Sequence, residues 1–258
     1  MSSEHVVVLT GGGGIIGRAM TTELTRRGHA VAVVDRDLDA ARACAEIAEA
    51  GLARPYRCDV ADPHDLVELR TRITSEMGVA RSLICNAATK SDNFFAPFEE
   101  FPLGDWNDVM ATNLTGPMLC AQVFGPAMTD IAGGSIVNVL SIYGLVAPDQ
   151  RIYEGSEYEG RAINTPAVYS ASKAGLWGLT KYLASYWGAA GIRINAVVPG
   201  GVFSGQNETF VEAYSARTML GRMAEAGEIA AATAFLISDD ASYITGQKIV
   251  VDGGLTAW

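Results

Sequence analysis

Short apolar runs alternate with longer amphipathic segments along almost the whole chain. The runs are rich in β-branched residues and predict strands at 6–9, 30–34, 83–85, 135–140, 192–198 and 248–251, with a weaker strand at 53–58. The intervening segments have the apolar spacing of helices, at 15–27, 38–50, 65–77, 105–131, 168–190 and 228–237. Strands that are apolar throughout are buried on both faces, and helices of this length can cross over between parallel strands. The pattern predicts an α/β fold, a doubly wound parallel sheet of about seven strands flanked by helices.

The length and composition are those of one domain. A chain of 258 residues fits a single α/β domain, and 49% hydrophobic residues can fill its core without disulfides or a structural metal. No linker, charge block or long repeat divides the sequence. Residues 1–258 are therefore expected to form one unit.

The net charge excludes two classes of partner. The chain carries 19 basic and 29 acidic residues, a formal charge of −10, which repels nucleic-acid phosphates and anionic lipid head groups. The first ten residues have no basic segment, and their apolar run is too short for a signal peptide. No apolar stretch reaches the roughly 18 residues of a membrane span. We expect a cytoplasmic protein with a small-molecule substrate and no nucleic-acid or membrane partner.

Cysteine and histidine form no recognisable metal or nucleophile motif. The four cysteines are widely separated and are expected to be buried thiols. The three histidines lie in no known pattern, so no metal site is expected. Proton transfer must therefore use other side chains.

A glycine-rich turn joins the first strand to the first helix. The sequence TGGGGIIG at 10–17 allows backbone N–H groups and a helix N-terminus to face a pyrophosphate. Asp35 ends the second strand, where a carboxylate can bind both adenosine ribose hydroxyls and repel a 2′-phosphate, which favours NAD over NADP. Arg36 keeps NADP open, because a guanidinium could pair with that phosphate. The alternative role for Asp35 is a helix N-cap before Leu38.

Further polar residues end the third and fourth strands. Asp59 could bind the adenine amino group, or could cap a turn before Pro63. Asn86 follows the fourth strand. Ligands of doubly wound sheets bind at the carboxyl ends of the strands, so these positions extend the expected dinucleotide site.

Tyr169 and Lys173 are the candidates for the chemistry. They lie four residues apart on an expected helix, which places the phenol and the ammonium on one face. Ser141 ends the fifth strand, and Asn113 belongs at the same sheet edge. A free phenol has a pKa of about 10, which a neighbouring ammonium and a cationic nicotinamide would lower. Hydride transfer to or from a carbon that bears oxygen needs such a proton donor and acceptor.

Over nearly its whole length the sequence resembles the compact, single-domain short-chain dehydrogenase/reductase family. The resemblance rests on TGGGGIIG, DV at 59–60, NAA at 86–88, Asn113, Ser141, YSASK at 169–173, PG at 199–200 and VDGG at 251–254. It implies a Rossmann-type fold and an NAD(P)-dependent oxidoreductase that interconverts a secondary alcohol and a ketone. It also implies a homotetramer or homodimer, in which the helices bearing Asn113 and Tyr169 pair between subunits.

The resemblance also implies individual roles. Tyr169 is the implied general acid/base, and Lys173 lowers its pKa and binds the nicotinamide ribose. Ser141 orients the substrate oxygen, and Asn113 holds a helix distortion and a water of the proton relay. The implied cofactor contacts are Gly11, Gly14, Ile16, Gly17, Asp35, Arg36, Asp59, Val60, Asn86, Ala87, Tyr169, Lys173, Pro199, Gly200, Val202 and Ser204.

Two features depart from the family pattern. Ile15 stands where the compact form has glycine, and the turn instead fits the TGxxGxxG of larger, epimerase-type members; we interpret this as variation within the loop. The span between Ser141 and Tyr169 is unusually long, and residues 148–166 are expected to be an inserted loop near the active site. The insertion is either a surface or subunit contact, or a part of the substrate site.

The expected class of substrate is inferred from the insertion and from a flap at residues 200–225. Ser141, Arg151, Asn164 and Gln206 are the candidate substrate-binding residues, and with Gln150 and Tyr153 they favour a polyhydroxylated or anionic substrate. The two segments are similar to those of a branch of the family that acts on sugar acids and nine-carbon sugars. Three alternatives remain: a 3-oxoacyl reductase-type ketone reductase, an epimerase or dehydratase with tightly held NAD, and a non-enzymatic dinucleotide sensor. The sensor is disfavoured because all four candidate catalytic residues are present.

Overall fold

One parallel sheet of seven strands organises the chain. The computed structural model describes residues 5–49, 51–131, 133–158 and 160–258, so the expected helix end at Ala50 and Glu159 of the insertion lie outside the described residues. The sheet order is β3-β2-β1-β4-β5-β8-β9, and each neighbouring pair is parallel. This confirms the predicted sheet. The strands are β1 (Val6–Thr10), β2 (Ala30–Asp35), β3 (Ala53–Arg57), β4 (Ala80–Cys85), β5 (Gly134–Val139), β8 (Ile192–Pro199) and β9 (Lys248–Val251).

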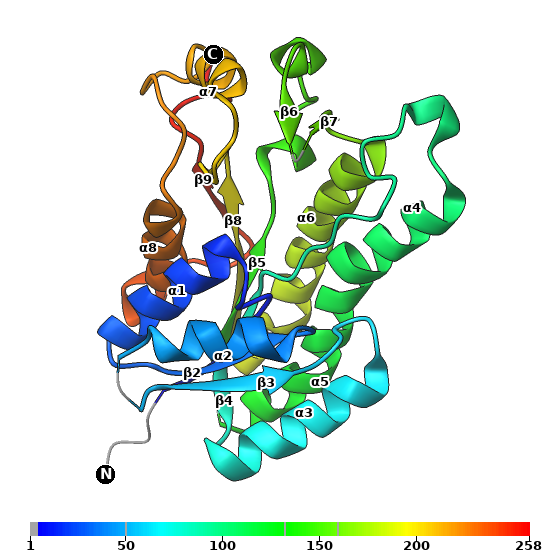
Figure 1. Cartoon of the computed structure of the whole chain (residues 1–258). Coiled ribbons are helices and arrows are strands. Elements are labelled where there is room, and N and C mark those ends of the chain that lie inside the picture. The colour runs from blue at the N-terminus through cyan, green and yellow to red at the C-terminus, as the bar shows by residue number, and fades with distance from the viewer. Residues whose placement is uncertain (1–4, 50, 132, 159) are drawn as a thin grey trace.

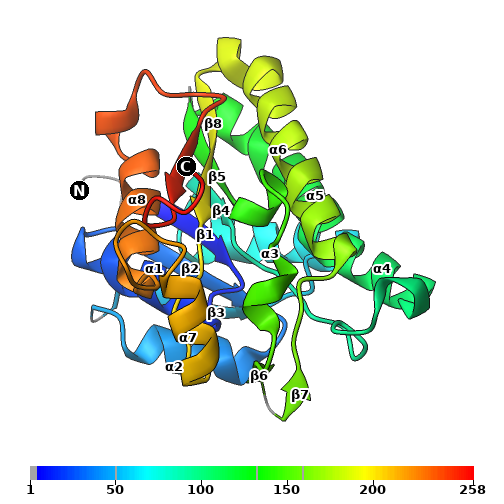
Figure 2. The ribbon, with the colours of Figure 1, turned by 90° about the horizontal axis from the view of Figure 1, so that it is seen from above.

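Helices cover both faces of the sheet, as Figures 1 and 2 show. One face packs against α1 (Ile15–Arg26), α2 (Leu38–Glu46) and α8 (Ala226–Ile237). The other packs against α3 (Pro63–Glu76), α5 (Gly116–Asp130) and α6 (Ala167–Trp187). The chain runs outward through β1, β2 and β3 and then returns to β4 on the other side of β1. The strand order therefore reverses between β1 and β4, which opens a ligand site at their carboxyl ends.

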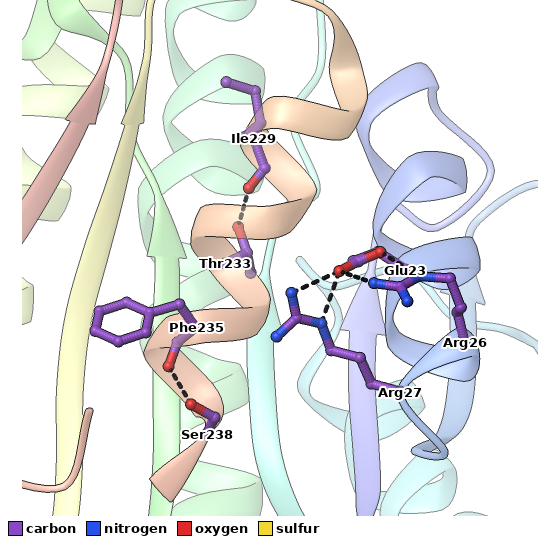
Figure 3. Close-up of polar contacts among 7 residues, drawn as sticks. All are labelled: Glu23, Arg26, Arg27, Ile229, Thr233, Phe235 and Ser238. Carbon is purple, nitrogen blue, oxygen red and sulfur yellow. Dashed lines mark hydrogen bonds and ion pairs between the residues drawn. The ribbon is translucent and has the colours of Figure 1, made fainter. Parts of the chain in front are cut away.

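Side-chain hydrogen bonds and ion pairs occur at the ends of α1 and α8 and within the interface between these two helices. Figure 3 shows Glu23 of α1 between Arg26 and Arg27, with nitrogen–oxygen distances of 2.9 and 2.6 Å. On α8 the buried Thr233 hydroxyl donates to the Ile229 carbonyl at 2.9 Å, so a polar group is satisfied inside the apolar interface. Ser238 donates in the same way to the Phe235 carbonyl where α8 ends.

The structure differs from the prediction in three elements. The single helix expected at 105–131 is divided into α4 (Leu103–Met110) and α5 by a π-helical turn, Ala111–Thr115. A helix that was not predicted, α7 (Glu208–Ser215), lies in the flap. The insertion contains a 3-10 turn, Gln150–Tyr153, and a hairpin of β6 (Glu157–Tyr158) and β7 (Arg161–Ala162). In Figure 1 this hairpin and α7 both stand above the carboxyl edge of the sheet.

Two sequence expectations concern the cysteines and the membrane. Cys44, Cys58, Cys85 and Cys120 are all buried and free, which confirms the expectation of buried thiols. Within the part of the chain that the structure describes, no helix combines the length and the apolar character needed to cross a membrane.

The packing of α5 on α6 depends on one glycine. A Cβ at Gly125 would lie 2.3 Å from the ring of Trp187, and a tryptophan ring has no flexible end that could yield. We expect Gly125→Ala to destabilise the fold by about 1–3 kcal/mol through overpacking. Gly227→Ala in α8 is the matched control, because nothing lies within 4 Å of its added Cβ, and alanine should stabilise that helix by up to about 1 kcal/mol. Urea unfolding measures both, and equal stability of the two variants would contradict the packing argument.

Candidate active site

The candidate catalytic residues meet at the carboxyl edge of the sheet. Ser141 lies two residues beyond the end of β5, and Tyr169 and Lys173 lie in the first turns of α6. Ser141 and Tyr169 line a pocket of about 470 Å³ that is bounded by the insertion, the flap and the loop after β4. Lys173 lies beneath Tyr169, with its ammonium 5.8 Å from the centre of the phenol ring. The structure thus brings together residues that are far apart in sequence.

Opposing influences act on the Tyr169 phenol. Burial raises its pKa above the usual value of a phenol, whereas a hydrogen bond with the Ser141 side chain lowers it. The ring packs edge-on against Phe94, with ring centres 6.3 Å apart. The Ser141 hydroxyl in turn accepts a hydrogen bond of 3.2 Å from the backbone N–H of Tyr143, in the 3-10 turn that follows β5. Ser141 is therefore held in place from the backbone while it faces Tyr169.

Lys173 is a buried cation. Its side chain is 3% exposed, and its ammonium donates to the Val139 carbonyl at 2.9 Å. Burial lowers the pKa of Lys173 to about 8, because desolvation disfavours the charged form. Gly144 makes this position possible, since a Cβ there would lie 2.7 Å from the Lys173 backbone.

Asn113 occupies the π-helical turn between α4 and α5. Its side chain is fully buried, and its carboxamide oxygen accepts a hydrogen bond of 3.0 Å from the backbone N–H of Thr89 in the loop after β4. Its amide nitrogen lies 3.5 Å from the hydroxyl of Ser172, the residue before Lys173. Asn113 therefore ties the distorted helix to both the loop after β4 and α6.

The glycine turn is too tight for side chains. Gly11 has a φ of 63°, and a Cβ at Gly17 would lie 2.3 Å from the Gly11 carbonyl oxygen. A Cβ at Gly12 would lie 2.5 Å from the Val33 side chain. The Asn86 side chain donates to the Gly11 carbonyl at 2.9 Å and holds the turn against β4. Such a cradle at the start of α1 fits a pyrophosphate, and Ile15 departs from the family pattern without disturbing it, because its side chain is 53% exposed and lines the pocket.

The adenosine end of the expected cofactor site is a small cavity of about 70 Å³. Its lining includes Asp35, Arg36, Asp59 and Val60. Asp35 accepts hydrogen bonds from the backbone N–H groups of Gly13 at 3.0 Å and of residue 37 at 3.1 Å, which hold its carboxylate beside the glycine turn. The N-cap of α2 is Asp37 and not Asp35, so the alternative role weighed for Asp35 is not seen. Asp59 accepts from the N–H of Ala61 at 2.9 Å and so shapes its own turn as well as the cavity.

The flap follows β8 and packs closely. Cβ atoms at Gly200 and Gly201 would lie within 3.0 Å of Tyr214 on α7, so the two glycines allow α7 to approach the end of the sheet. Val202 pairs with Ala224 by an isolated parallel bridge, and Ser204 lines the pocket.

The candidate substrate residues differ in where they lie. Asn164 and Gln206 line the pocket. The Asn164 amide nitrogen donates to the Phe95 carbonyl, but its Oδ1 is buried with no hydrogen-bond partner among the described residues. Both ends of the Gln206 carboxamide bind the backbone, at Val202 and Ser204. The structure does not bring Arg151 to the pocket, because its side chain is 80% exposed and pairs with Asp149 at 2.7 Å. Of these three candidates, Asn164 therefore keeps a free acceptor at the pocket, whereas Gln206 is bonded within the flap and Arg151 lies outside.

Sequence reasoning missed most of the pocket's apolar wall. The rings come from the loop after β4, from the turn after β5, from the insertion and from α7, so no single stretch of sequence contains their pattern.

Lys90 is the one charged side chain among the described residues that line this pocket, and its ammonium lies 5.5 Å from the centre of the Phe95 ring. A larger cavity of about 950 Å³ lies beside it, but that cavity is lined by none of the four candidate catalytic residues. The aromatic lining residues of the smaller pocket are Phe94, Phe95, Tyr143, Tyr153, Tyr169, Phe210 and Tyr214.

Comparison with known proteins agrees with this geometry. A family model described as enoyl-(acyl carrier protein) reductase matches residues 13–256. The chain is 35% identical to cis-4-hydroxycyclohexanecarboxylate dehydrogenase of Sinomonas cyclohexanicum, over 99% of this chain and 98% of that protein. It is 33% identical to D-threitol dehydrogenase of Mycolicibacterium smegmatis, over 97% of this chain and 92% of that protein.

A solved structure extends the agreement to the fold. The crystal structure of a short-chain dehydrogenase from Leptospira borgpetersenii with bound NAD+ matches with a TM-score of 0.85 at 30% identity, and covers 98% of this chain and 93% of that one. The glycine turn, the family model and these relatives agree over nearly the whole chain. The chain therefore belongs to the short-chain dehydrogenase/reductase family and is an NAD(P)-dependent oxidoreductase that acts on CH–OH groups.

Proposed function

We propose that this chain interconverts a small secondary alcohol and its ketone, with Tyr169 as the general acid/base and NAD as the preferred cofactor. The contact of the Tyr169 phenol with the Ser141 side chain, directly above a buried ammonium, carries this proposal. A proton donor and a hydrogen-bonding hydroxyl side by side can hold one substrate oxygen from two directions. The pocket that both residues line gives that oxygen access.

Ser141 and Tyr169 have different roles in the proposed reaction. In oxidation, the Ser141 hydroxyl holds the substrate oxygen while the Tyr169 phenolate takes the proton of the alcohol. In reduction, the Tyr169 phenol gives its proton to the ketone oxygen. The glycine turn and the pocket would hold a nicotinamide cofactor, which would supply the hydride chemistry.

Lys173 acts on Tyr169 through its charge. A cation close to a phenol stabilises the phenolate and lowers the phenol pKa, which opposes the effect of burial. The bond to the Val139 carbonyl keeps the ammonium in place. In the proposed cofactor complex the same ammonium also binds the nicotinamide ribose.

The preference for NAD rests on Asp35. Its carboxylate is held at the cavity by two backbone N–H groups, where it can accept hydrogen bonds from the ribose hydroxyls. A 2′-phosphate at the same place would meet a negative charge. Arg36 lines the same cavity and supplies the weaker, opposing attraction for NADP.

The surface of α6 leads us to propose a homo-oligomer, a homotetramer or homodimer. Tyr182 and Tyr186 are stacked on α6 and are 64% and 65% exposed. Exposed aromatic side chains on one helix are typical of contact surfaces between subunits.

Removal of the phenol hydroxyl tests the acid/base role. Tyr169→Phe should lower kcat by about 10²–10⁴ because only the proton donor is lost. NADH affinity, measured by fluorescence titration, should stay within about threefold. Tyr243→Phe is the matched control, since this tyrosine is fully exposed, and it should leave kcat unchanged. A normal kcat in folded Tyr169→Phe would refute the mechanism.

Removal of the buried charge tests the electrostatic role. Without the ammonium the pKa of Tyr169 rises, so less phenolate is present at a given pH. In Lys173→Met, the rising limb of the plot of kcat against pH for alcohol oxidation should therefore move to higher pH. The plot is measured at saturating NAD from about pH 6 to 10. Lys181→Met removes an exposed charge from the same helix and should leave the limb in place. An unmoved limb in Lys173→Met would contradict this role.

Asp35→Ala tests the cofactor preference. We expect the ratio of kcat/KM for NAD to that for NADP to fall by about tenfold or more, because a hydrogen-bond acceptor and a repelling charge are both lost. Asp37→Ala is the control: it removes the N-cap of α2 and should cost about 1 kcal/mol of stability without changing the ratio. A wild-type enzyme that strongly prefers NADP would show that the assignment is wrong.

A further inference from the structure

The pocket lies between two apolar clusters. One cluster contains Phe94 and Phe95 from the loop after β4, with Tyr169 packed against it. The other joins Tyr153 of the insertion to Phe210 and Tyr214 of α7. Both clusters contribute rings to the lining of the pocket. Its side walls are therefore aromatic faces and edges.

Tyr153 is fixed in its wall from several directions. Its ring stacks on Phe210, with centres 5.5 Å apart and an angle of 23° between the planes. Its hydroxyl lies 2.5 Å from the Thr165 hydroxyl and donates to the Tyr143 hydroxyl at 3.2 Å. Because these bonds occupy its polar end, Tyr153 offers the pocket a ring rather than a hydroxyl.

An ion pair holds the insertion to the flap beside this stack. Asp149, at the start of the insertion, pairs with Arg217, just beyond α7. The Arg151 guanidinium binds the same carboxylate, and together they lower the pKa of Asp149 to about 2. The insertion thus supports the flap and sets the position of the Tyr153 ring.

The amide side chains of the pocket are partly bonded within the protein. Asn164 donates to the Phe95 carbonyl, while its Oδ1 is buried with no hydrogen-bond partner among the described residues. Both ends of the Gln206 carboxamide bind the backbone of the flap. The ring faces of the two clusters offer the hydroxyls of a polyol no replacement for their water contacts.

We propose that the pocket takes an alicyclic secondary alcohol, or its ketone, with a ring of about the size of cyclohexane, and that Tyr153 selects for that ring. This inference rests on the proposed function. A saturated ring places flat rows of C–H groups against aromatic faces. It also has few rotatable bonds, so it loses less conformational entropy on binding than an open chain with the same number of carbons. With its carbinol oxygen between Ser141 and Tyr169, such a ring lies between the two clusters.

The first test compares three uncharged alcohols with NAD as cofactor. Cyclohexanol, hexan-2-ol and threitol represent a ring, an open chain and a polyol, and their lack of charge keeps the charge of Lys90 out of the comparison. We expect kcat/KM for cyclohexanol to exceed both of the others by about tenfold or more. An equal or higher value for hexan-2-ol or threitol would overturn the proposal.

The second test separates the ring of Tyr153 from its hydroxyl. Tyr153→Ala should raise KM for cyclohexanol about tenfold with kcat within about threefold, and should change KM for hexan-2-ol by less than about threefold. Tyr153→Phe keeps the ring and should stay within about threefold for both alcohols. A general structural role would instead affect both alcohols equally in Tyr153→Ala, and that result would contradict ring selection. If Tyr153→Ala fails to fold by circular dichroism, Phe210→Leu removes the stacking partner and takes its place.

A binding measurement gives a readout that does not need turnover. Cyclohexanone titrated into the enzyme–NADH complex, followed by NADH fluorescence, should bind about tenfold more weakly to Tyr153→Ala than to the wild type. Absence of binding, or equal affinities, would refute the inference. Failure of the proposed function looks different: no alcohol would be oxidised in a way that depends on Tyr169. Tyr169-dependent oxidation of threitol without preference for cyclohexanol would overturn only the ring selectivity.

Discussion

Every strand of the sheet runs in the same direction, helices cover both faces of the sheet, and this constraint places the site. The sheet interior has no room for unpaired polar groups, so reactive side chains must lie at or beyond the strand ends. The reversal of order between β1 and β4 brings the glycine turn, Asn86 and Ser141 to one edge. Close approach of backbones, through Gly17 at the turn and Gly144 against α6, then fixes the distances between these elements.

The proposed chemistry depends on a charge that the fold keeps away from water. An isolated ammonium in a protein interior is costly, and among the described residues a backbone carbonyl is the hydrogen-bond acceptor of the buried Lys173 ammonium. Burial lowers its pKa to about 8 and raises that of Tyr169, so each group is moved away from its charged form. In the proposed mechanism, a negative phenolate next to the positive ammonium would relieve both effects.

The parts of the site differ in how firmly the fold determines them. The candidate catalytic residues lie at the end of the sheet and on α6, which belong to the core of the fold. The substrate side is built instead from the insertion and the flap, which are held together by the stack of Tyr153 on Phe210 and by the pair of Asp149 with Arg217. These contacts lie outside the sheet core, so this wall of the pocket can change without disturbing the residues proposed to transfer the proton.

The strands, most helices, the glycine turn and the pairing of Tyr169 with Lys173 could be predicted from the sequence, because they depend on short-range periodicity and spacing. The resemblance to the family supplied the expected meeting of Ser141 and Asn113 with them. Tertiary structure alone decided which partner each polar side chain took: Arg151 turned outward to Asp149, and Gln206 bonded to its own flap. It also decided the aromatic wall of the pocket, whereas a helix distortion at Asn113 was already implied by the resemblance. The aromatic wall joins segments far apart in the chain and so leaves no periodic signal in any one of them. The contacts of Arg151 and Gln206 span only two to four residues, in loops whose conformation short-range periodicity does not predict.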